Sequence, residues 1–277
     1  AFAVINANLK PILVDIEPLT PNISIKEIAK KITKKTKVIM PVHLYGSAAN
    51  LKEIKKLINK KNIYLVDDCA QAHGTYSDSE NSKNKKIGSS SDISCFSLYP
   101  GKNLGAYGDA GIITTNNKSL YLKISNIRNL GSDKKYIHDN VGVNSRLDTI
   151  QAIILNKKIK RLSFYNKQRQ KIAKLYNSKI INDKITKLKH SRSSVYHQYV
   201  ILVKNRKKLI NLLESKKIQY GFHYPFAIHQ LEIFKNRFFK QKFKNSERLA
   251  REGLSIPIDP NLSKSEMNFI INTLNSF

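Results

Sequence analysis

The sequence has 277 residues, with 49 Lys or Arg against 20 Asp or Glu, so its formal net charge is +29. No apolar run approaches the roughly 20 residues that a helix needs to span a bilayer, which argues against a membrane protein. Only nine of the basic residues are arginines, and the lysines are spread without an arginine cluster or interleaved aromatic residues, so the charge does not indicate nucleic-acid binding.

The cysteines and the first residues bear on the compartment. Cys69 and Cys95 stand in apolar, strand-like segments without metal-type spacing, which is typical of small core residues in a reducing compartment. The opening AFAVINANLK lacks the basic start and the cleavage-type end of a signal peptide. We therefore expect a cytoplasmic protein, with length enough for one large or two ordinary domains.

Strands and helices alternate through the first part of the chain. The predicted elements are a helix end at 1–7, a strand at 11–16, a helix at 24–35, a strand at 37–42, a helix at 51–61 and a strand at 63–66. This rhythm predicts an α/β fold with a mainly parallel sheet. His43 follows one of these strands, where it either touches a substrate or, as we favour, makes a structural hydrogen bond.

Two carboxylates, Asp67 and Asp68, follow the apolar run at residues 63–66. They therefore lie at the carboxyl end of a strand, the edge of open α/β sheets where ligands bind. A helix cap is the alternative for Asp68, because acids commonly begin the loops between strands and helices. The position of Asp68 indicates a ligand site only if a second chemical group lies beside it.

A lysine supplies that second group within residues 94–111, which read SCFSLYPGKNLGAYGDAG. An apolar strand predicted over 93–98 breaks at Pro100-Gly101 and leads directly into Lys102. A lysine in a partly dry pocket can lose its proton and attack a carbonyl to form a Schiff base. Alone, the stretch fits a surface lysine in a glycine-rich turn. Paired with Asp68 at a neighbouring strand end, it fits the site of pyridoxal phosphate, with the acid on the pyridinium nitrogen.

The second part of the chain is predicted to contain further strands and one long helix. The predicted elements are a loop at 76–91, a strand at 110–115, a helix at 120–128, a loop at 129–144, a helix at 147–179, a strand at 195–203, a helix at 206–216, a short strand at 220–224 and a helix from 263. Residues 234–243 mix aromatic residues with lysines, which fits a substrate lid or, as we favour, ordinary packing.

Five segments together resemble the sugar aminotransferases of the DegT/DnrJ/EryC1/StrS family. They are PVHLYG at 41–46, VDDCAQAHG at 66–74, the lysine stretch at 94–111, GVNSRLD at 142–148 and HYP at 223–225. The resemblance implies an aspartate aminotransferase-like fold (fold type I). The expected domains are a pyridoxal phosphate-binding large domain with a mainly parallel sheet over residues 1–180, including the linking helix, and a small C-terminal α+β domain over 181–277.

The resemblance also implies roles for individual residues. Lys102 corresponds to the catalytic lysine that binds the cofactor, and Asp68 to the partner of its ring nitrogen. The other expected cofactor contacts are Gln71 near the ring, Ser97 at the phosphate and Asn144 at the phosphate of a neighbouring subunit's cofactor. Tyr107, His223 and Tyr224 are expected to contact the substrate, although core packing explains His223 and Tyr224 equally well. No metal ion is expected.

The expected reaction is the transfer of an amino group from L-glutamate to a nucleotide-linked keto sugar, with pyridoxal phosphate as cofactor, in a homodimer with shared active sites. The form PGKNLG resembles members that act on dTDP-3-keto-6-deoxyhexoses. The family's Gly-Thr turn and stacking aromatic, which precede the segment matched by residues 1–16, are not found, so we expect either a missing front segment or an incomplete phosphate-binding site. The alternatives are an inactive or partner-dependent fragment, a sugar dehydratase of the same family, in which a histidine replaces the lysine, and a basic binding module.

Overall fold

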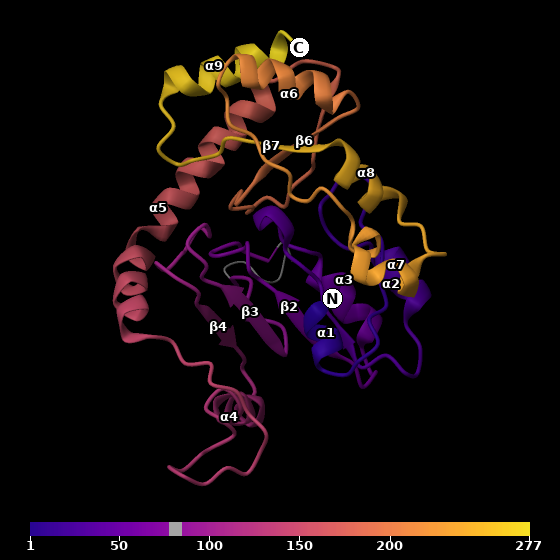
Figure 1. Cartoon of the computed structure of the whole chain (residues 1–277), viewed down its shortest axis with the longest axis vertical. Coiled ribbons are helices and arrows are strands. Elements are labelled where there is room, and N and C mark those ends of the chain that lie inside the picture. The colour runs from indigo at the N-terminus through magenta and orange to yellow at the C-terminus, as the bar shows by residue number, and fades with distance from the viewer. Residues whose placement is uncertain (78–84) are drawn as a thin grey trace. The chain divides into compact units, whose positions relative to one another are not determined.

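The computed structural model describes residues 1–77 and 85–277, and it separates into two compact units (Figure 1). Neither unit is one continuous stretch. Unit 1 consists of Ala1–Lys35, Gln168–Ser191 and Gln198–Phe277, and unit 2 consists of Thr36–Lys167 and Arg192–His197. The predicted loop at 76–91 lies partly outside the described residues, and at its base Tyr76 forms a single antiparallel bridge with Lys86.

Unit 2 is built on a four-stranded sheet in the order β1-β2-β3-β4. The strands are β1 (Val38–Ile39), β2 (Tyr64–Asp68), β3 (Ile93–Ser97) and β4 (Gly111–Thr114). The first three strands are parallel and β4 is antiparallel to β3. Figure 1 shows β2, β3 and β4 side by side. The predicted mainly parallel sheet is therefore confirmed.

Helices connect these strands as the apolar periodicity predicts. Unit 2 contains a short 3-10 turn η1 (Leu44–Gly46), the helices α3 (Leu51–Ile58) and α4 (Lys118–Ile127), and the first part of α5 (Thr149–Lys179). Asn50 is the N-cap of helix α3, and its side chain accepts a hydrogen bond from the Glu53 amide. The helix buries Leu51 and Ile54. Burial of these two side chains holds the crossover between β1 and β2 on the sheet.

Helix α5 is the longest helix and passes from unit 2 into unit 1. Its bounds agree with the prediction of a helix over 147–179. It buries Leu155 in unit 2, and it buries Ile172, Ala173 and Tyr176 in unit 1. Within the described residues, no helix is at once long enough and apolar enough to cross a membrane.

Unit 1 contains a three-stranded antiparallel sheet in the order β5-β6-β7. Its strands are β5 (Ile185–Lys187), β6 (Tyr199–Val203) and β7 (Gly253–Ile256). Its helical segments are α1 (Phe2–Asn6), α2 (Ile25–Lys31), the last part of α5, α6 (Arg206–Ser215), η3 (Ile228–Gln230), α7 (Glu232–Phe238), α8 (Lys244–Glu252) and α9 (Lys264–Asn275). Every residue of β6 is buried, so this strand forms the centre of the unit's core.

Four strand predictions differ from the structure. The strand predicted over 37–42 is reduced to the two residues of β1. Residues 11–16 form no strand, because Asp15 instead accepts hydrogen bonds from the first amides of α8 and Ile16 makes only a single bridge, to Ile23. The strand predicted over 195–203 begins only at Tyr199, because the residues before it turn away to bond loops of unit 2. The strand predicted over 220–224 is reduced to one bridge between Gly221 and Ser255.

Residues 234–243 pack rather than form an open lid. Helix α7 covers the first part of this stretch, and Phe234 and Phe238 lie four residues apart on its buried face. Phe243 is buried as well. The packing alternative that the sequence favoured is therefore the one observed.

The compact units only partly resemble the domains expected from the sequence. The expected boundary near residue 180 falls at the end of α5, whereas the units change at Lys167 within this helix. Residues 1–35 group with the C-terminal part of the chain. The division into a domain over 1–180 and a domain over 181–277 stays a prediction.

Candidate active site

Asp68 lies at the carboxyl end of β2, where the sequence placed it. Its backbone pairs with Cys95 of β3, and its carboxylate oxygen Oδ1 accepts a hydrogen bond from the Ala70 amide at 2.9 Å. No further hydrogen bond to this carboxylate comes from the residues that the structure describes. The side chain is half-buried, so a ligand can still reach its second oxygen.

Lys102 lies in a tight loop that follows β3. The Lys102 amide donates to the Tyr99 carbonyl at 2.9 Å, and the Ala106 amide closes the loop on the Leu98 carbonyl at 2.7 Å. Gly105 allows this closure, because a Cβ atom there would lie 2.4 Å from the Pro100 carbonyl oxygen. Lys102 is therefore held by the backbone of a compact loop.

An apolar cluster fixes the same loop to helix α5. Leu98, Leu104 and Ala106 are buried and pack with Leu155 of α5. The lysine lies between the first two of these apolar residues in the sequence. The cluster therefore anchors the chain on both sides of Lys102 and leaves its ammonium group as the polar part of the loop.

The structure brings Lys102 and Asp68 within electrostatic reach of each other. Burial lowers the pKa of Lys102 from its ordinary value, and the negative charge of Asp68 partly offsets that change. The Lys102 side chain donates no assigned hydrogen bond to the described residues. An amine whose proton is made easier to remove, facing a carboxylate on the next strand, can act as both a nucleophile and a base.

Gln71 and Ser97 lie on the two strand ends that carry this pair. Gln71 follows β2 and is buried, and its Oε1 accepts a hydrogen bond from the Tyr45 amide at 2.6 Å. Ser97 is the last residue of β3 and is half-buried, and its hydroxyl oxygen accepts from the Tyr99 amide at 3.3 Å. Both side chains therefore lie beside the loops that hold Asp68 and Lys102.

His73 also faces this region, and the sequence analysis assigned it no role. Its ring is buried and packs at a tilt of 51° against Phe96, with 5.5 Å between the ring centroids, and neither nitrogen has an assigned hydrogen-bond partner among the described residues. Burial lowers the pKa of His73 to about 4; the backbone of Ser97 opposes this change and the charge of Lys102 adds to it. The only sequence signal for His73 is its place in the VDDCAQAHG motif, five residues after Asp68.

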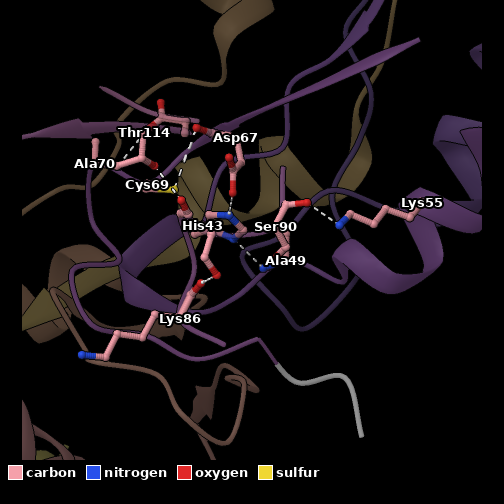
Figure 2. Close-up of polar contacts among 12 residues, drawn as sticks. His43, Ala49, Lys55, Asp67, Cys69, Ala70, Lys86, Ser90 and Thr114 are labelled. Carbon is pink, nitrogen blue, oxygen red and sulfur yellow. Dashed lines mark hydrogen bonds and ion pairs between the residues drawn. The ribbon is translucent and has the colours of Figure 1, made fainter. Parts of the chain in front are cut away.

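His43 and Asp67, the residue before Asp68 in the chain, form a buried polar cluster (Figure 2). His43 Nδ1 accepts a hydrogen bond from the Ala49 amide at 2.9 Å, so Nε2 carries the proton and donates it to Asp67 Oδ2 at 3.1 Å. Burial would raise the pKa of Asp67, but the hydrogen bond from His43 and the nearby Ser94 hydroxyl hold it below its ordinary value. The structural alternative for His43 is confirmed.

His43, Asp67 and Cys69 offer three ligand atoms within 4.8 Å of one another and are the group of described residues that could hold a metal ion. Burial raises the pKa of the Cys69 thiol, so the thiolate that binds metals is disfavoured. The proton on His43 Nε2 already bonds Asp67. These side chains therefore fit a hydrogen-bonded core cluster better than a metal site.

The remaining predicted residues lie outside this group. Asn144 is exposed on the segment between α4 and α5 and accepts a hydrogen bond from Arg146 Nε at 3.0 Å. Tyr107 is exposed just after the lysine loop, and its amide donates to Gln151 Oε1 at 2.8 Å. His223 and Tyr224 belong to unit 1, where His223 Nδ1 lies 2.7 Å from the Ser255 hydroxyl. Their roles stay predictions.

Comparison with known proteins adds to this geometry. The profile of the DegT/DnrJ/EryC1/StrS aminotransferase family matches residues 1–275. The dTDP-3-amino-3,6-dideoxy-alpha-D-galactopyranose transaminase of Aneurinibacillus thermoaerophilus is 38% identical over 280 residues, which cover all of this chain and 76% of that protein. Other relatives are named for UDP-linked and GDP-linked sugars.

Two solved structures have the same fold over almost the whole chain. DesV of S. venezuelae superposes with a TM-score of 0.94 at 30% identity, and the match covers 99% of this chain and 74% of DesV. NtdA of Bacillus subtilis, solved with bound cofactor PMP, superposes with a TM-score of 0.89 at 28% identity, covering 99% of this chain and 63% of NtdA. The fold of this chain is therefore the fold of the sugar aminotransferases.

Proposed function

Because the chain belongs to the DegT/DnrJ/EryC1/StrS aminotransferase family, we propose that it transfers an amino group from L-glutamate to a keto sugar linked to a nucleoside diphosphate. The observation that carries this proposal is the pair formed by Lys102 and Asp68. They lie after neighbouring parallel strands and interact electrostatically, and Lys102 has a lowered pKa. Surface lysines in glycine-rich turns do not combine these features.

Pyridoxal phosphate is the cofactor that these residues fit. When bound, it accepts the electrons released as a carbon–hydrogen bond beside the nitrogen breaks. Asp68 offers a carboxylate whose second oxygen is left for an outside donor, and the half-buried Lys102 amine lacks an assigned partner among the described residues. These two groups are what a pyridine nitrogen and an aldehyde require.

Lys102 would bind the aldehyde and later move the proton at the substrate carbon. Its Nζ needs to be neutral for both tasks, and burial in the loop favours the neutral form. The compact loop limits the motion of the backbone at Lys102, so the amine returns to the same place after each transfer. Lys102 is the residue that we propose to be catalytic.

The neighbouring residues would orient the cofactor. The Asp68 charge would keep the ring nitrogen protonated. Gln71 would lie along the ring, with its amide held by Tyr45, and the Ser97 hydroxyl at the end of β3 would contact the phosphate. His223, Tyr224 and Tyr107 stay the proposed substrate contacts.

The proposed sugar is a dTDP-linked 3-keto-6-deoxyhexose. The support is the PGKNLG form of the lysine loop and the 38% identity to a relative named for a dTDP-3-amino sugar. Relatives named for UDP and GDP sugars make the nucleotide the first property to test. The product would be an amino sugar used in the synthesis of cell-surface polysaccharide.

We further propose that the enzyme works as a cytoplasmic homodimer with shared active sites. Asn144, which would reach the partner's cofactor, lies on an exposed segment rather than beside Lys102. The same segment exposes the apolar side chains of Tyr136, Val141 and Val143, which a partner subunit would cover. These two features support an intersubunit role for the segment.

The function is tested by supplying the full chain with pyridoxal phosphate, ¹⁵N-labelled L-glutamate and a dTDP-, UDP- or GDP-linked keto sugar. We expect ¹⁵N to appear in the sugar, fastest with the dTDP-linked substrate, and the Lys102→Ala variant to lose about a thousandfold or more in rate. Lys207→Ala, at an exposed position on α6, is the matched control and should keep the wild-type rate.

Other outcomes would contradict the proposal. Full turnover by Lys102→Ala would remove the lysine from the mechanism. Loss of a sugar hydroxyl without gain of ¹⁵N would indicate the dehydratase alternative, and no reaction by a folded dimer loaded with cofactor would indicate an inactive fragment.

A further inference from the structure

A six-residue segment of the chain enters unit 2 separately from the rest of that unit. Arg192–His197 belongs to unit 2, although the residues before and after it belong to unit 1. Within this segment, residues 195–197 bond two loops that lie beside the Lys102–Asp68 pair. We refer to these three residues as the 195–197 segment.

The first bonded loop follows β1. The Val195 amide donates to the Gly46 carbonyl at 3.1 Å, and the His197 amide donates to the Tyr45 carbonyl at 2.9 Å. Gly46 has a φ of +87°, and a Cβ atom there would lie 2.8 Å from a methyl of Val195, so the contact needs glycine. Because the Tyr45 amide bonds Gln71, the 195–197 segment also fixes the loop that orients Gln71.

The second bonded loop contains Lys102, and the contact is made by its neighbour Asn103. The Asn103 amide group Nδ2 donates to the Val195 carbonyl at 3.1 Å and to Asn166 Oδ1 at 3.0 Å. Its Oδ1 lies 3.1 Å from His197 Nδ1, which donates. Both hydrogens and the oxygen of the Asn103 side chain are thus used, which fixes the orientation of this amide.

Asn166 extends the same network to the loop after β2. This side chain of α5 is buried, and its Nδ2 donates to the His73 carbonyl at 2.8 Å. The charge of Lys102 helps to lower the pKa of His73, so the His73 ring lies within electrostatic reach of Lys102. Asn103, the residue after Lys102, is therefore bonded to the 195–197 segment and to Asn166 of α5. Through Asn166 it is also linked to the loop that follows Asp68.

We propose that Asn103 is a positioning residue for Lys102, and that the 195–197 segment acts on Lys102 through Asn103. The role of Lys102 in this inference rests on the proposed function. Both hydrogens and the oxygen of the Asn103 amide are paired, so any displacement of this side chain leaves a donor or an acceptor without its partner. The network therefore holds Lys102 at one depth in the site.

Among the described residues, three charged or titratable groups interact with Lys102 or with its loop. They are Asp68 from the end of β2 and His73 from the loop that follows it, and Lys158 of α5 bonds the Gly105 carbonyl in the same loop. Truncation of Asn103 removes none of these charges. It frees the loop to move toward water, so the Lys102 amine should be better hydrated and more often protonated.

The test is competitive acetylation of the full chain without cofactor, with the extent of modification at Lys102 read from its peptide mass across a pH series. In Asn103→Ala we expect the labelling rate of Lys102 near pH 8 to fall by about threefold or more, because its titration moves to higher pH. Asn116→Ala removes one exposed bond, to the Ser89 carbonyl, and serves as the matched control with no effect on Lys102.

A second variant keeps the test valid if Asn103→Ala fails to fold correctly. His197→Phe keeps a ring of similar size and removes the bond to Asn103 Oδ1, so it should change the labelling of Lys102 in the same direction by a smaller factor. If the 195–197 segment acts through Asn103, the double variant should label like Asn103→Ala alone.

The inference is overturned if Asn103→Ala and His197→Phe both label Lys102 at the wild-type rate across the pH series. It is also overturned if the two effects simply add. Because the assay uses no cofactor and no substrate, its result is separate from the ¹⁵N transfer that tests the function, and either proposal can fail while the other holds.

Discussion

Lys102 acquires its chemistry from a small number of neighbours. The loop hydrogen bonds and the apolar cluster set its position, burial favours its neutral form, and the Asp68 charge opposes that effect. His73 adds a buried imidazole whose nitrogens have no assigned hydrogen bond within the described residues. The position and the pKa of Lys102 are therefore set by the residues that surround it in the fold.

Asp68→Asn tests the role of the carboxylate. The amide oxygen of Asn can still accept from the Ala70 amide, so the local turn is kept and only the charge is lost. We expect kcat for amino transfer to fall by about 10²- to 10³-fold, while pyridoxal phosphate still binds. Asp183→Asn, at an exposed position, is the control. An unchanged kcat in Asp68→Asn would exclude Asp68 as the partner of the ring nitrogen.

His73 predicts a dependence of stability on pH. Its pKa is about 4 in the folded chain, whereas an unfolded histidine titrates near 6.5, so between these values the unfolded chain binds the extra proton. The free energy of unfolding should therefore fall as pH drops, with His73 contributing about 2 kcal/mol between pH 6.5 and pH 5.

Urea unfolding at the two pH values measures this contribution. His73→Phe keeps an aromatic ring against Phe96. In this variant the decrease in unfolding free energy between pH 6.5 and pH 5 should be smaller by the contribution of His73, and the exposed His138→Asn is the matched control. A His73→Phe chain with the wild-type pH profile would show that this imidazole is already protonated in the fold.

The strand ends organise the site at the level of secondary structure. Asp68 and Ser97 are the last residues of two parallel strands, and the loop after the second strand carries Lys102. The buried His43–Asp67 pair is next to Asp68: Asp67 precedes it in β2, and the His43 amide donates to the Asp68 carbonyl at 3.0 Å. This pair therefore holds the end of β2 against the turn that follows β1.

His43→Ala tests the importance of this pair for the fold. It leaves the fully buried Asp67 carboxylate without its donor, which should cost about 3 kcal/mol of unfolding free energy. Lys56→Ala removes an exposed ion pair with Glu53 and should cost less than about 0.5 kcal/mol. Chemical denaturation measures the free energy of unfolding of both variants. Equal decreases in the two variants would show that the buried His43–Asp67 pair contributes little to stability.

The sequence predicts the parts of the fold that follow local patterns. Apolar runs before Asp68 and Lys102 identify two of the central strands, and helical periodicity identifies α5. The sequence does not predict β5, α8 or β7, which are short. It also does not predict the Asn103 network, whose partners lie 63 to 94 residues away, because polar contacts at that separation leave no periodic signal.

At the level of the whole molecule, the excess of lysine gives the chain a large positive net charge. The chain has a formal charge of +29, and we propose that its site binds a diphosphate. Such a field raises the local concentration of an anionic substrate and is screened by salt. The same charge lacks the arginine clusters of nucleic-acid binders.

The charge predicts how the reaction depends on ionic strength. We expect KM for the nucleotide sugar to rise several-fold from low to high salt, with a smaller change in kcat, because salt weakens encounter more than the buried contacts. Steady-state kinetics at several salt concentrations measure both constants. A KM that is constant over this range would show that the surface charge plays no part in substrate capture.

The central claim is that Lys102 binds pyridoxal phosphate covalently. The most direct measurement is to incubate the full chain with pyridoxal phosphate, reduce with borohydride and locate the added mass by peptide sequencing in the mass spectrometer. We predict that the label lies on the peptide that contains Lys102, at one equivalent per chain. A label spread over the exposed lysines, with Lys102 unmodified at saturating cofactor, would contradict the account.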